Sequence, residues 1–127
     1  MANGTKIALS EEELRVVTDT NWILTKQAIT AKIYELFNQQ VPVIRQKLDQ
    51  LPVRFPPELI FSLPKISRGE NYNGFPYVML DYPAVFEKHK IFALRTMLWW
   101  GNFISVTLLL TGEYKDTYGS VIGERCV

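Results

Sequence analysis

The amino-acid sequence predicts an α+β fold in which N-terminal helices pack on one face of an antiparallel sheet of about four strands, formed by two hairpins. Three observations predict it. Apolar residues recur at helical spacing within residues 10–50, prolines crowd residues 51–64, and two turn-forming pairs divide the strand-like residues 65–112. Residues 113–127 form a C-terminal tail, for which a short helix and a further strand both remain open.

Composition places the chain among ordinary globular domains. Its 127 residues have the size of one domain, so we expect residues 1–127 to fold as a single domain. The formal net charge of +1 gives no global field that would attract nucleic acid. Cys126 is the only cysteine, and the N-terminal residues contain no apolar run of signal-peptide length. We therefore expect a cytoplasmic protein without internal disulfides.

The first half of the chain has the patterns of helices. Ser10 and Glu13 have the spacing of a capping box, in which each side chain bonds the backbone of the other residue, and predict a helix start. After a break near residues 18–21, an apolar stripe predicts a helix face that meets the core. Pro42 interrupts the stripe and predicts a kink or a restart between Gln40 and Pro42. The stripe consists of Ile29, Ile33, Leu36, Phe37, Ile44 and Leu48.

Residues 51–64 are predicted to be a connector, because four prolines restrict both themselves and the residues before them. Its apolar residues suggest that the connector packs on the core. A proline-rich ligand for a recognition domain is the alternative. The apolar residues are Val53, Phe55, Leu59, Ile60 and Phe61.

Asn73-Gly74 predicts the first hairpin, since this pair tolerates the positive φ angles of a tight turn. The strands would flank it, with Pro76 confined to an edge or a bulge because it has no N–H to donate. A longer loop from Gly69 to Pro76 is the competing geometry.

The apolar residues 91–112 are long enough to cross a bilayer, but we predict a second hairpin instead. Arg95 inside a spanning helix would cost about 2.5–3.5 kcal/mol. Gly101-Asn102 has the composition of a two-residue turn with glycine first, so the run can fold back on itself.

If Trp100 pairs with Phe103, the hairpin has two distinct faces. One carries Arg95 together with an aliphatic row that should meet the helical stripe, made of Ile104, Val106, Leu108 and Leu110. The other carries aromatic and aliphatic residues that need a cover, and we expect a second copy to supply it in a homodimer. These candidate interface residues are Trp100, Phe103, Phe92 and Leu94.

Arg95 on an apolar face requires a partner, because an unpaired buried charge is very costly. Asp81, Glu70 or Glu35 can supply a carboxylate, and a bound anion is the alternative. Tyrosines near Asn73-Gly74 are typical of recognition surfaces. The candidate ligand-binding residues are Arg95, Asp81, Tyr77 and Tyr72.

No catalytic motif and no metal-ligand spacing is present in the sequence. His89 is the only histidine and lies in a polar connection, so we expect a solvated turn residue and no metal or cofactor. Two functions remain open. The first is a non-catalytic binding or assembly module that uses the aromatic sheet face. The second is a binder of an anionic small molecule, or a small enzyme, with a helix–sheet pocket around Arg95.

Overall fold

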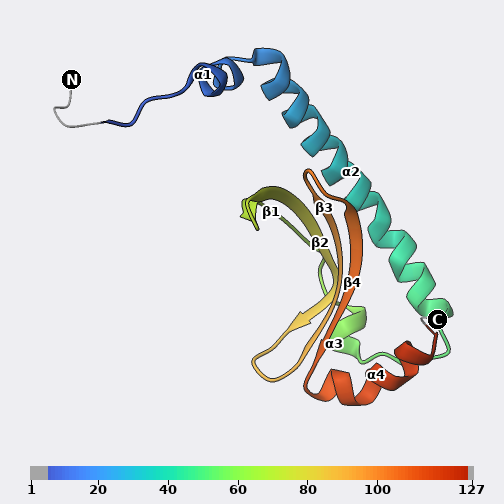
Figure 1. Ribbon diagram of the computed structural model, residues 1–127. Coiled ribbons are helices and arrows are strands. Elements are labelled where there is room, and N and C mark those ends of the chain that lie inside the picture. Colours follow the sequence, from blue (N-terminus) through green and yellow to red (C-terminus); the bar gives the residue numbers. More distant parts are fainter. Residues whose placement is uncertain (1–5, 126–127) are drawn as a thin grey trace. The chain divides into compact units, whose positions relative to one another are not determined.

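The computed structural model describes residues 6–125 and has the predicted α+β architecture (Figure 1). A helical N-terminal part precedes a four-stranded antiparallel sheet, and a last helix follows it. The chain divides into two compact units, residues 1–32 and 33–127. In chain order the elements are α1 (Glu11–Val17), α2 (Thr20–Gln50), α3 (Pro57–Ile60), β1 (Lys65–Tyr72), β2 (Phe75–Phe86), β3 (Ile91–Trp99), β4 (Ile104–Thr111) and α4 (Glu113–Arg125).

The first unit contains α1 and the first part of α2. The predicted capping box is confirmed: the Glu13 N–H donates to the Ser10 hydroxyl (3.0 Å), and the Ser10 N–H donates to the Glu13 carboxylate (2.8 Å). These hydrogen bonds lower the pKa of Glu13. A break then separates α1 from α2, and the Asp19 carboxylate caps α2 by accepting from the Trp22 N–H (2.9 Å).

The second unit begins inside α2, which continues without interruption through Pro42. Of the two predicted alternatives near Gln40 to Pro42, a kink or a restart, the restart is therefore wrong. Phe37 before the proline and Ile44 after it both pack on the sheet, so tertiary contacts hold the helical path on each side of the missing N–H. Packing of α2 on the sheet therefore outweighs the tendency of Pro42 to interrupt a helix.

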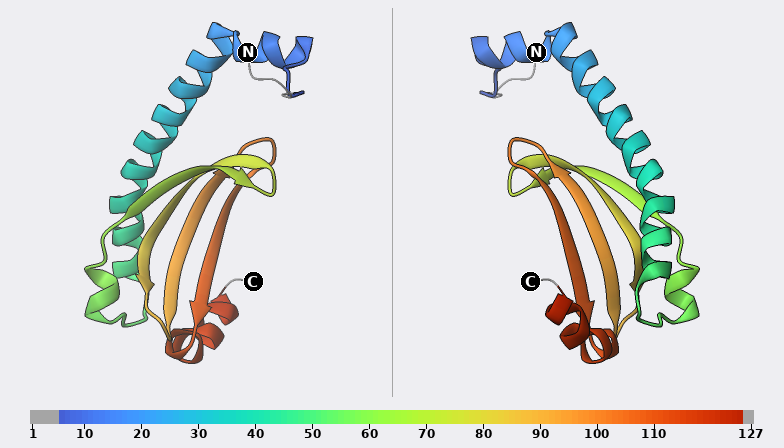
Figure 2. Two further views of the ribbon diagram at one scale, coloured as in Figure 1. Left: turned by 90° about the vertical axis from the view of Figure 1, so that its left-hand side faces the viewer. Right: turned by 90° about the vertical axis from the view of Figure 1, so that its right-hand side faces the viewer.

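The sheet is a meander with the order β1-β2-β3-β4. Within residues 33–127, Figures 1 and 2 show it curved, with α2 behind its convex face. The predicted turn at Asn73-Gly74 is confirmed, because both residues have positive φ angles (51° and 90°) and join β1 to β2 directly. The strands pair in antiparallel fashion on either side of it.

The second hairpin is confirmed, but its predicted register is wrong by one residue. Trp99, not Trp100, is opposite Phe103, since the Trp99 N–H donates to the Phe103 carbonyl (3.0 Å). Trp100 bonds β2 instead, through its N–H and the Pro76 carbonyl (2.9 Å). Gly101, at φ 75°, therefore sits in the middle of a three-residue loop. Within residues 6–125 no helix is long and apolar enough to cross a bilayer.

The shifted register moves Arg95 to the other face of the sheet. Arg95 lies opposite Thr107, not Leu108, and successive side chains point to opposite faces. Arg95 is therefore on the concave face, away from α2, which corrects the prediction that it shares a face with the aliphatic row of β4. That row faces the α2 side as predicted. Phe92 and Leu94 are on the α2 side as well, because Phe92 is opposite Leu110 and Leu94 is opposite Leu108.

Two apolar clusters hold the second unit together. In the first, Phe37 of α2 packs on Val78, Leu80 and Tyr82 of β2. In the second, the connector, β3 and α4 contribute Phe55, Leu59, Phe92, Tyr114 and Tyr118. The connector thus packs on the core through Phe55 and Leu59, whereas Ile60 and Phe61 are exposed. Cys126 lies outside the described residues.

Candidate functional site

The four candidate ligand-binding residues lie on one face of the sheet, the concave one. Val78 and Leu80 pack against α2, so strand alternation turns Tyr77, Met79 and Asp81 to the opposite side. Across the ladder, Asp81 is opposite Arg95 and Tyr77 is opposite Trp99. The rings of Tyr72 and Tyr77 contact each other edge to face, with centroids 6.1 Å apart. All four residues therefore lie on the concave face. The sequence prediction had placed Arg95 on the other face, with the aliphatic row of β4.

Asp81 and Arg95 form a two-pronged ion pair. The Arg95 Nε donates to one carboxylate oxygen (2.8 Å), and Nη2 donates to the other (3.2 Å). The Asp81 side chain is only 4% exposed, whereas that of Arg95 is 31% exposed. The hydrogen bond to Asp81 raises the pKa of Arg95, so the guanidinium stays charged. A charged donor group is thus fixed in orientation while part of it faces solvent.

An aromatic group surrounds Trp99 at one end of the concave face. The Trp99 ring contacts Tyr72 (centroids 5.2 Å apart), Phe103 (5.6 Å) and Phe75 (6.2 Å), each edge to face. Its indole N–H donates to the Tyr72 carbonyl (2.9 Å). Tyr72, Phe75 and Phe103 are each 44–59% exposed. We call Tyr72, Phe75, Tyr77, Trp99 and Phe103 the Trp99 cluster.

Gly69 of β1 makes room for the Trp99 cluster. A Cβ at this position would lie 2.6 Å from the ring of Tyr77, which rests against the strand there. The register of β1 and β2 also shifts between Gly69 and Tyr72. The glycine therefore permits a close approach of ring to backbone, which is the usual reason for glycine inside a strand.

The four candidate interface residues do not share one exposed face. Phe92 is 3% exposed and belongs to the second apolar cluster. Leu94 lines a groove beside α2, Phe103 joins the Trp99 cluster, and Trp100 lies in the loop. Sequence reasoning missed Trp99 and Phe75 as members of the aromatic group. The signal was present, because Trp99 and Arg95 are four residues apart in one strand and share a face in any register, while the observed pairing adds Tyr77 opposite Trp99.

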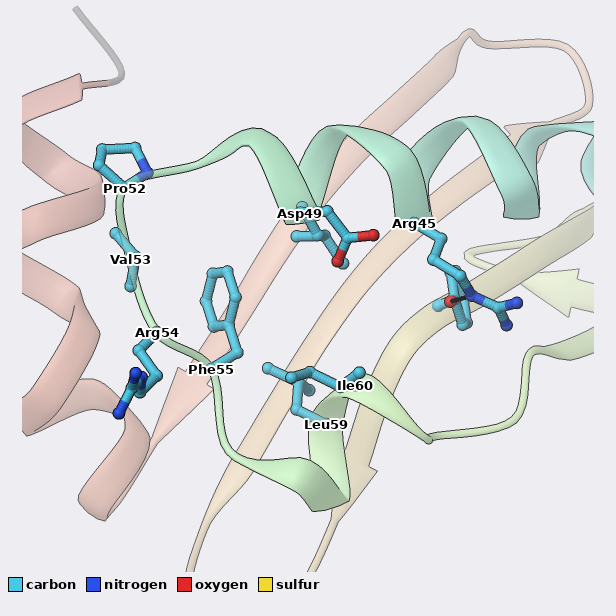
Figure 3. Close-up of a pocket in the computed structure, with 10 residues that line it drawn as sticks. Arg45, Asp49, Pro52, Val53, Arg54, Phe55, Leu59 and Ile60 are labelled. Carbon is cyan, nitrogen blue, oxygen red and sulfur yellow. Dashed lines mark hydrogen bonds between the residues drawn. The ribbon is translucent and has the colours of Figure 1, made fainter.

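A second candidate site lies on the α2 side, where the end of α2, the connector and α3 enclose a pocket of about 370 Å³ (Figure 3). Arg45 donates from Nε to the hydroxyl of the buried Tyr82 (2.9 Å). Arg95 does not line this pocket. The pocket is lined by Arg45, Leu48, Asp49, Pro52, Val53, Arg54, Phe55, Leu59, Ile60 and Tyr82.

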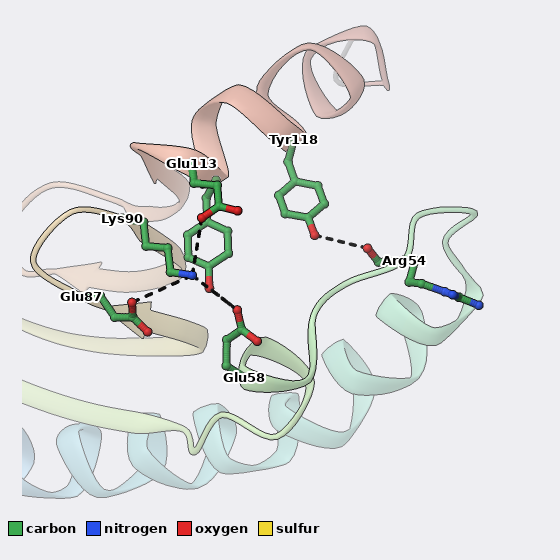
Figure 4. Close-up of polar contacts among 7 residues, drawn as sticks. Arg54, Glu58, Glu87, Lys90, Glu113 and Tyr118 are labelled. Carbon is green, nitrogen blue, oxygen red and sulfur yellow. Dashed lines mark hydrogen bonds and ion pairs between the residues drawn. The ribbon is translucent and has the colours of Figure 1, made fainter.

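A polar network around Lys90 joins α3, α4 and the β2–β3 connection (Figure 4). The Lys90 ammonium lies 3.7 Å from carboxylate oxygens of Glu58 and Glu113, 4.0 Å from Glu87, and 5.0 Å from the centre of the Tyr114 ring. The Tyr114 hydroxyl donates to Glu58 (3.0 Å). Burial, with this bond, raises the pKa of Tyr114 to about 12. These contacts fasten three segments together, which gives the network a structural role.

The described residues offer no candidate metal centre. Within residues 6–125 no group of histidine, cysteine or carboxylate side chains could hold a metal ion. His89 is exposed in the turn between β2 and β3. No family model matches the chain, and no curated protein or solved structure gives a significant match. The geometry of the sites is therefore the basis for inferring a function.

Proposed function

We propose that the protein is a non-catalytic binding module whose concave sheet face receives its partner. The observation that carries this proposal is the Trp99 cluster, an exposed group of aromatic rings on the same sheet face as the oriented guanidinium of Arg95. Trp, Tyr and Arg are the residue types that dominate the binding energy of interfaces. A monomer rarely exposes such a group without using it.

The arrangement selects a particular ligand chemistry. The edges and faces of the Trp99 cluster suit a flat apolar group. Two of the Arg95 N–H groups bond Asp81, and within the described residues no acceptor bonds the others. Those remaining N–H groups suit a carboxylate or another oxyanion. The preferred partner is thus an aromatic or apolar group that also carries a negative charge, on a peptide or on a small molecule.

Dye binding tests the proposal, because anilinonaphthalene sulfonate combines an aromatic body with one anionic group. We expect its fluorescence to rise on the wild-type protein and its affinity to fall at least about tenfold in Trp99→Leu. Trp100→Leu is the matched control, since Trp100 lies in the adjacent loop outside the Trp99 cluster. The same affinity in wild type and Trp99→Leu would show that the concave face does not bind, and would overturn the proposal.

The pocket beside Arg45 supports a second candidate function, the binding of an apolar acid on the α2 side. Its volume of about 370 Å³ is in the range of small-molecule sites, and its walls combine apolar residues with Arg45, Asp49 and Arg54. Calorimetric titration with decanoate tests it. Ile60→Trp should fill the pocket and abolish the binding of decanoate. Arg45→Gln should weaken the binding of decanoate but not that of decanol. Binding that survives Ile60→Trp would exclude the pocket.

We also propose that the module acts as a homodimer. The described residues leave part of the α2 side of the sheet uncovered, since Ile104 and Val106 are 61% and 66% exposed. Self-association with a second copy of the chain would bury such a surface.

A further inference from the structure

The two outer strands of the sheet differ in how they protect their open edges. β1 carries the charged residues Lys65, Arg68 and Glu70, and its pairing is irregular after Gly69. β4 has no charged residue and no proline, and it pairs with β3 over eight consecutive positions without a bulge. Charges and bulges are the usual devices that prevent a sheet edge from pairing with another strand. The β1 edge has them, and the β4 edge lacks them.

The surface next to the β4 edge is also apolar. On the α2 side, a groove of about 260 Å³ lies between α2 and strands β3 and β4. Ile104 and Val106 form its outer wall, and Leu36 of α2 is 42% exposed on the opposite wall. No charged residue lines it; the lining residues are Ile33, Leu36, Phe37, Gln40, Ile44, Leu94, Thr96, Ile104 and Val106. A partner strand at this edge would therefore meet no charge on β4 or among the residues that line the groove.

We infer that β4 pairs in antiparallel fashion with β4 of a second copy, which joins the two sheets into one of eight strands. This inference rests on the homodimer proposed above and identifies the surface that forms it. A two-fold axis at Thr107 brings Val106 beside Leu108 of the second copy, and Ile104 beside Leu110. On the α2 side of the two paired β4 strands, every aliphatic residue is then opposite another aliphatic residue.

A second copy fits this edge better than an unrelated strand, because the β4 sequence is compatible with itself. In the two-fold register the opposed side chains on each face contain no charge, so no like charges are brought together. The concave faces of the two copies also become continuous. Both Trp99 clusters then lie along one extended surface, which gives the dimer two equivalent binding sites.

The mass of the full-length protein, measured by light scattering during size exclusion, tests the inference. We expect twice the chain mass of 14.7 kDa for the wild type and a single chain mass for Val106→Lys. Val106 is 66% exposed, so the lysine can be accommodated in a folded monomer, and an unchanged circular dichroism spectrum would establish this. The control is Phe61→Lys, which charges another exposed apolar residue (79%) far from β4 along the chain and should remain dimeric.

The outcomes separate this inference from the proposals before it. A monomeric wild type overturns both the homodimer and the β4 pairing. A dimeric wild type with an equally dimeric Val106→Lys overturns only the β4 pairing. Dye binding by the concave face should survive in Val106→Lys, because Val106 is on the α2 side.

A cross-link tests the register directly. In a Cys126→Ser background, Thr107→Cys places a thiol next to the two-fold axis, and mild oxidation should yield a covalent dimer on a denaturing gel. Thr111→Cys is the matched control, because the same register puts residue 111 far from its own copy. Failure of Thr107→Cys to cross-link, or equal cross-linking of both variants, would overturn the proposed register.

Discussion

The two faces of the sheet are held together by different kinds of contact. On the α2 side, Phe37, Leu80 and Tyr82 pack as an apolar layer. On the concave side, an ion pair and edge-to-face aromatic rings replace that layer. Residues adjacent in one strand therefore experience different environments. Leu80 is fully buried by hydrocarbon, while its neighbour Asp81 is nearly as buried but depends on one partner.

This difference predicts how the stability of the protein responds to substitutions on each face. Apolar packing is shared among many neighbours, so its loss grows with the volume removed. A buried ion pair is a contact between two groups, and the loss of one leaves the other uncompensated. The α2 side should respond to the size of a substitution, and the concave side should respond to its chemistry.

The largest effect is expected for Leu80→Ala, which removes a side chain that is 0% exposed. We expect the free energy of unfolding to fall by about 3–4 kcal/mol, because the surrounding apolar layer cannot collapse fully into the cavity. Met79→Ala, at the adjacent residue on the concave face, should cost about 2 kcal/mol, because Met79 is buried but belongs to neither apolar cluster. Urea denaturation measures both, and equal losses would show that the faces do not differ as described.

The next effect concerns the ion pair. Arg95→Met leaves the Asp81 carboxylate buried without its counter-charge, and should lower the free energy of unfolding by about 3 kcal/mol. The double variant Arg95→Met with Asp81→Asn should recover part of this loss, because the buried charge is gone. A thermal melt of the two variants and the wild type measures the recovery. If the double variant is less stable than Arg95→Met, the buried charge of Asp81 is not the cause of the stability loss in Arg95→Met.

A smaller effect is expected for Gly69→Ala. Alanine usually stabilises a strand relative to glycine, but here its Cβ would collide with the Tyr77 ring. We expect a loss of about 1 kcal/mol and a change in tryptophan fluorescence as the Trp99 cluster rearranges. Adding Tyr77→Ala should remove the collision, so that Gly69→Ala becomes neutral or stabilising in that background. A loss of the same size in both backgrounds would contradict this account.

Sequence reasoning predicted the contacts of the α2 side more readily than those of the concave side. The outward or inward placement of Ile104, Val106 and Leu108 follows from alternation within one strand, and needs no knowledge of the neighbouring strand. The capping box at Ser10 and the turn at Asn73-Gly74 are likewise local signals, and both are confirmed.

The concave side depends on register, which local signals do not fix. The Gly101-Asn102 pair is compatible with loops of two and of three residues, and the hydrogen bond from Trp100 to Pro76 of β2 selects the longer one. With the three-residue loop, Arg95 lies on the concave face, opposite to the predicted one, and Trp99 lies beside Tyr72. The placement of Trp99 therefore depended on a contact with a distant strand.

The smallest effect is a pH dependence from the α2 side, where Tyr114 is buried and bonded to Glu58. Its pKa is raised from 10 to about 12, so the folded chain keeps a proton that the unfolded chain releases between these values. This contribution to stability is complete below pH 10 and is lost as the pH rises toward 12. Tyr114→Phe should be less stable by roughly 1 kcal/mol at neutral pH, yet lose stability less steeply above pH 10. Urea midpoints measured from pH 8 to 11 test this, and parallel curves for the two proteins would show that Tyr114 does not carry the dependence.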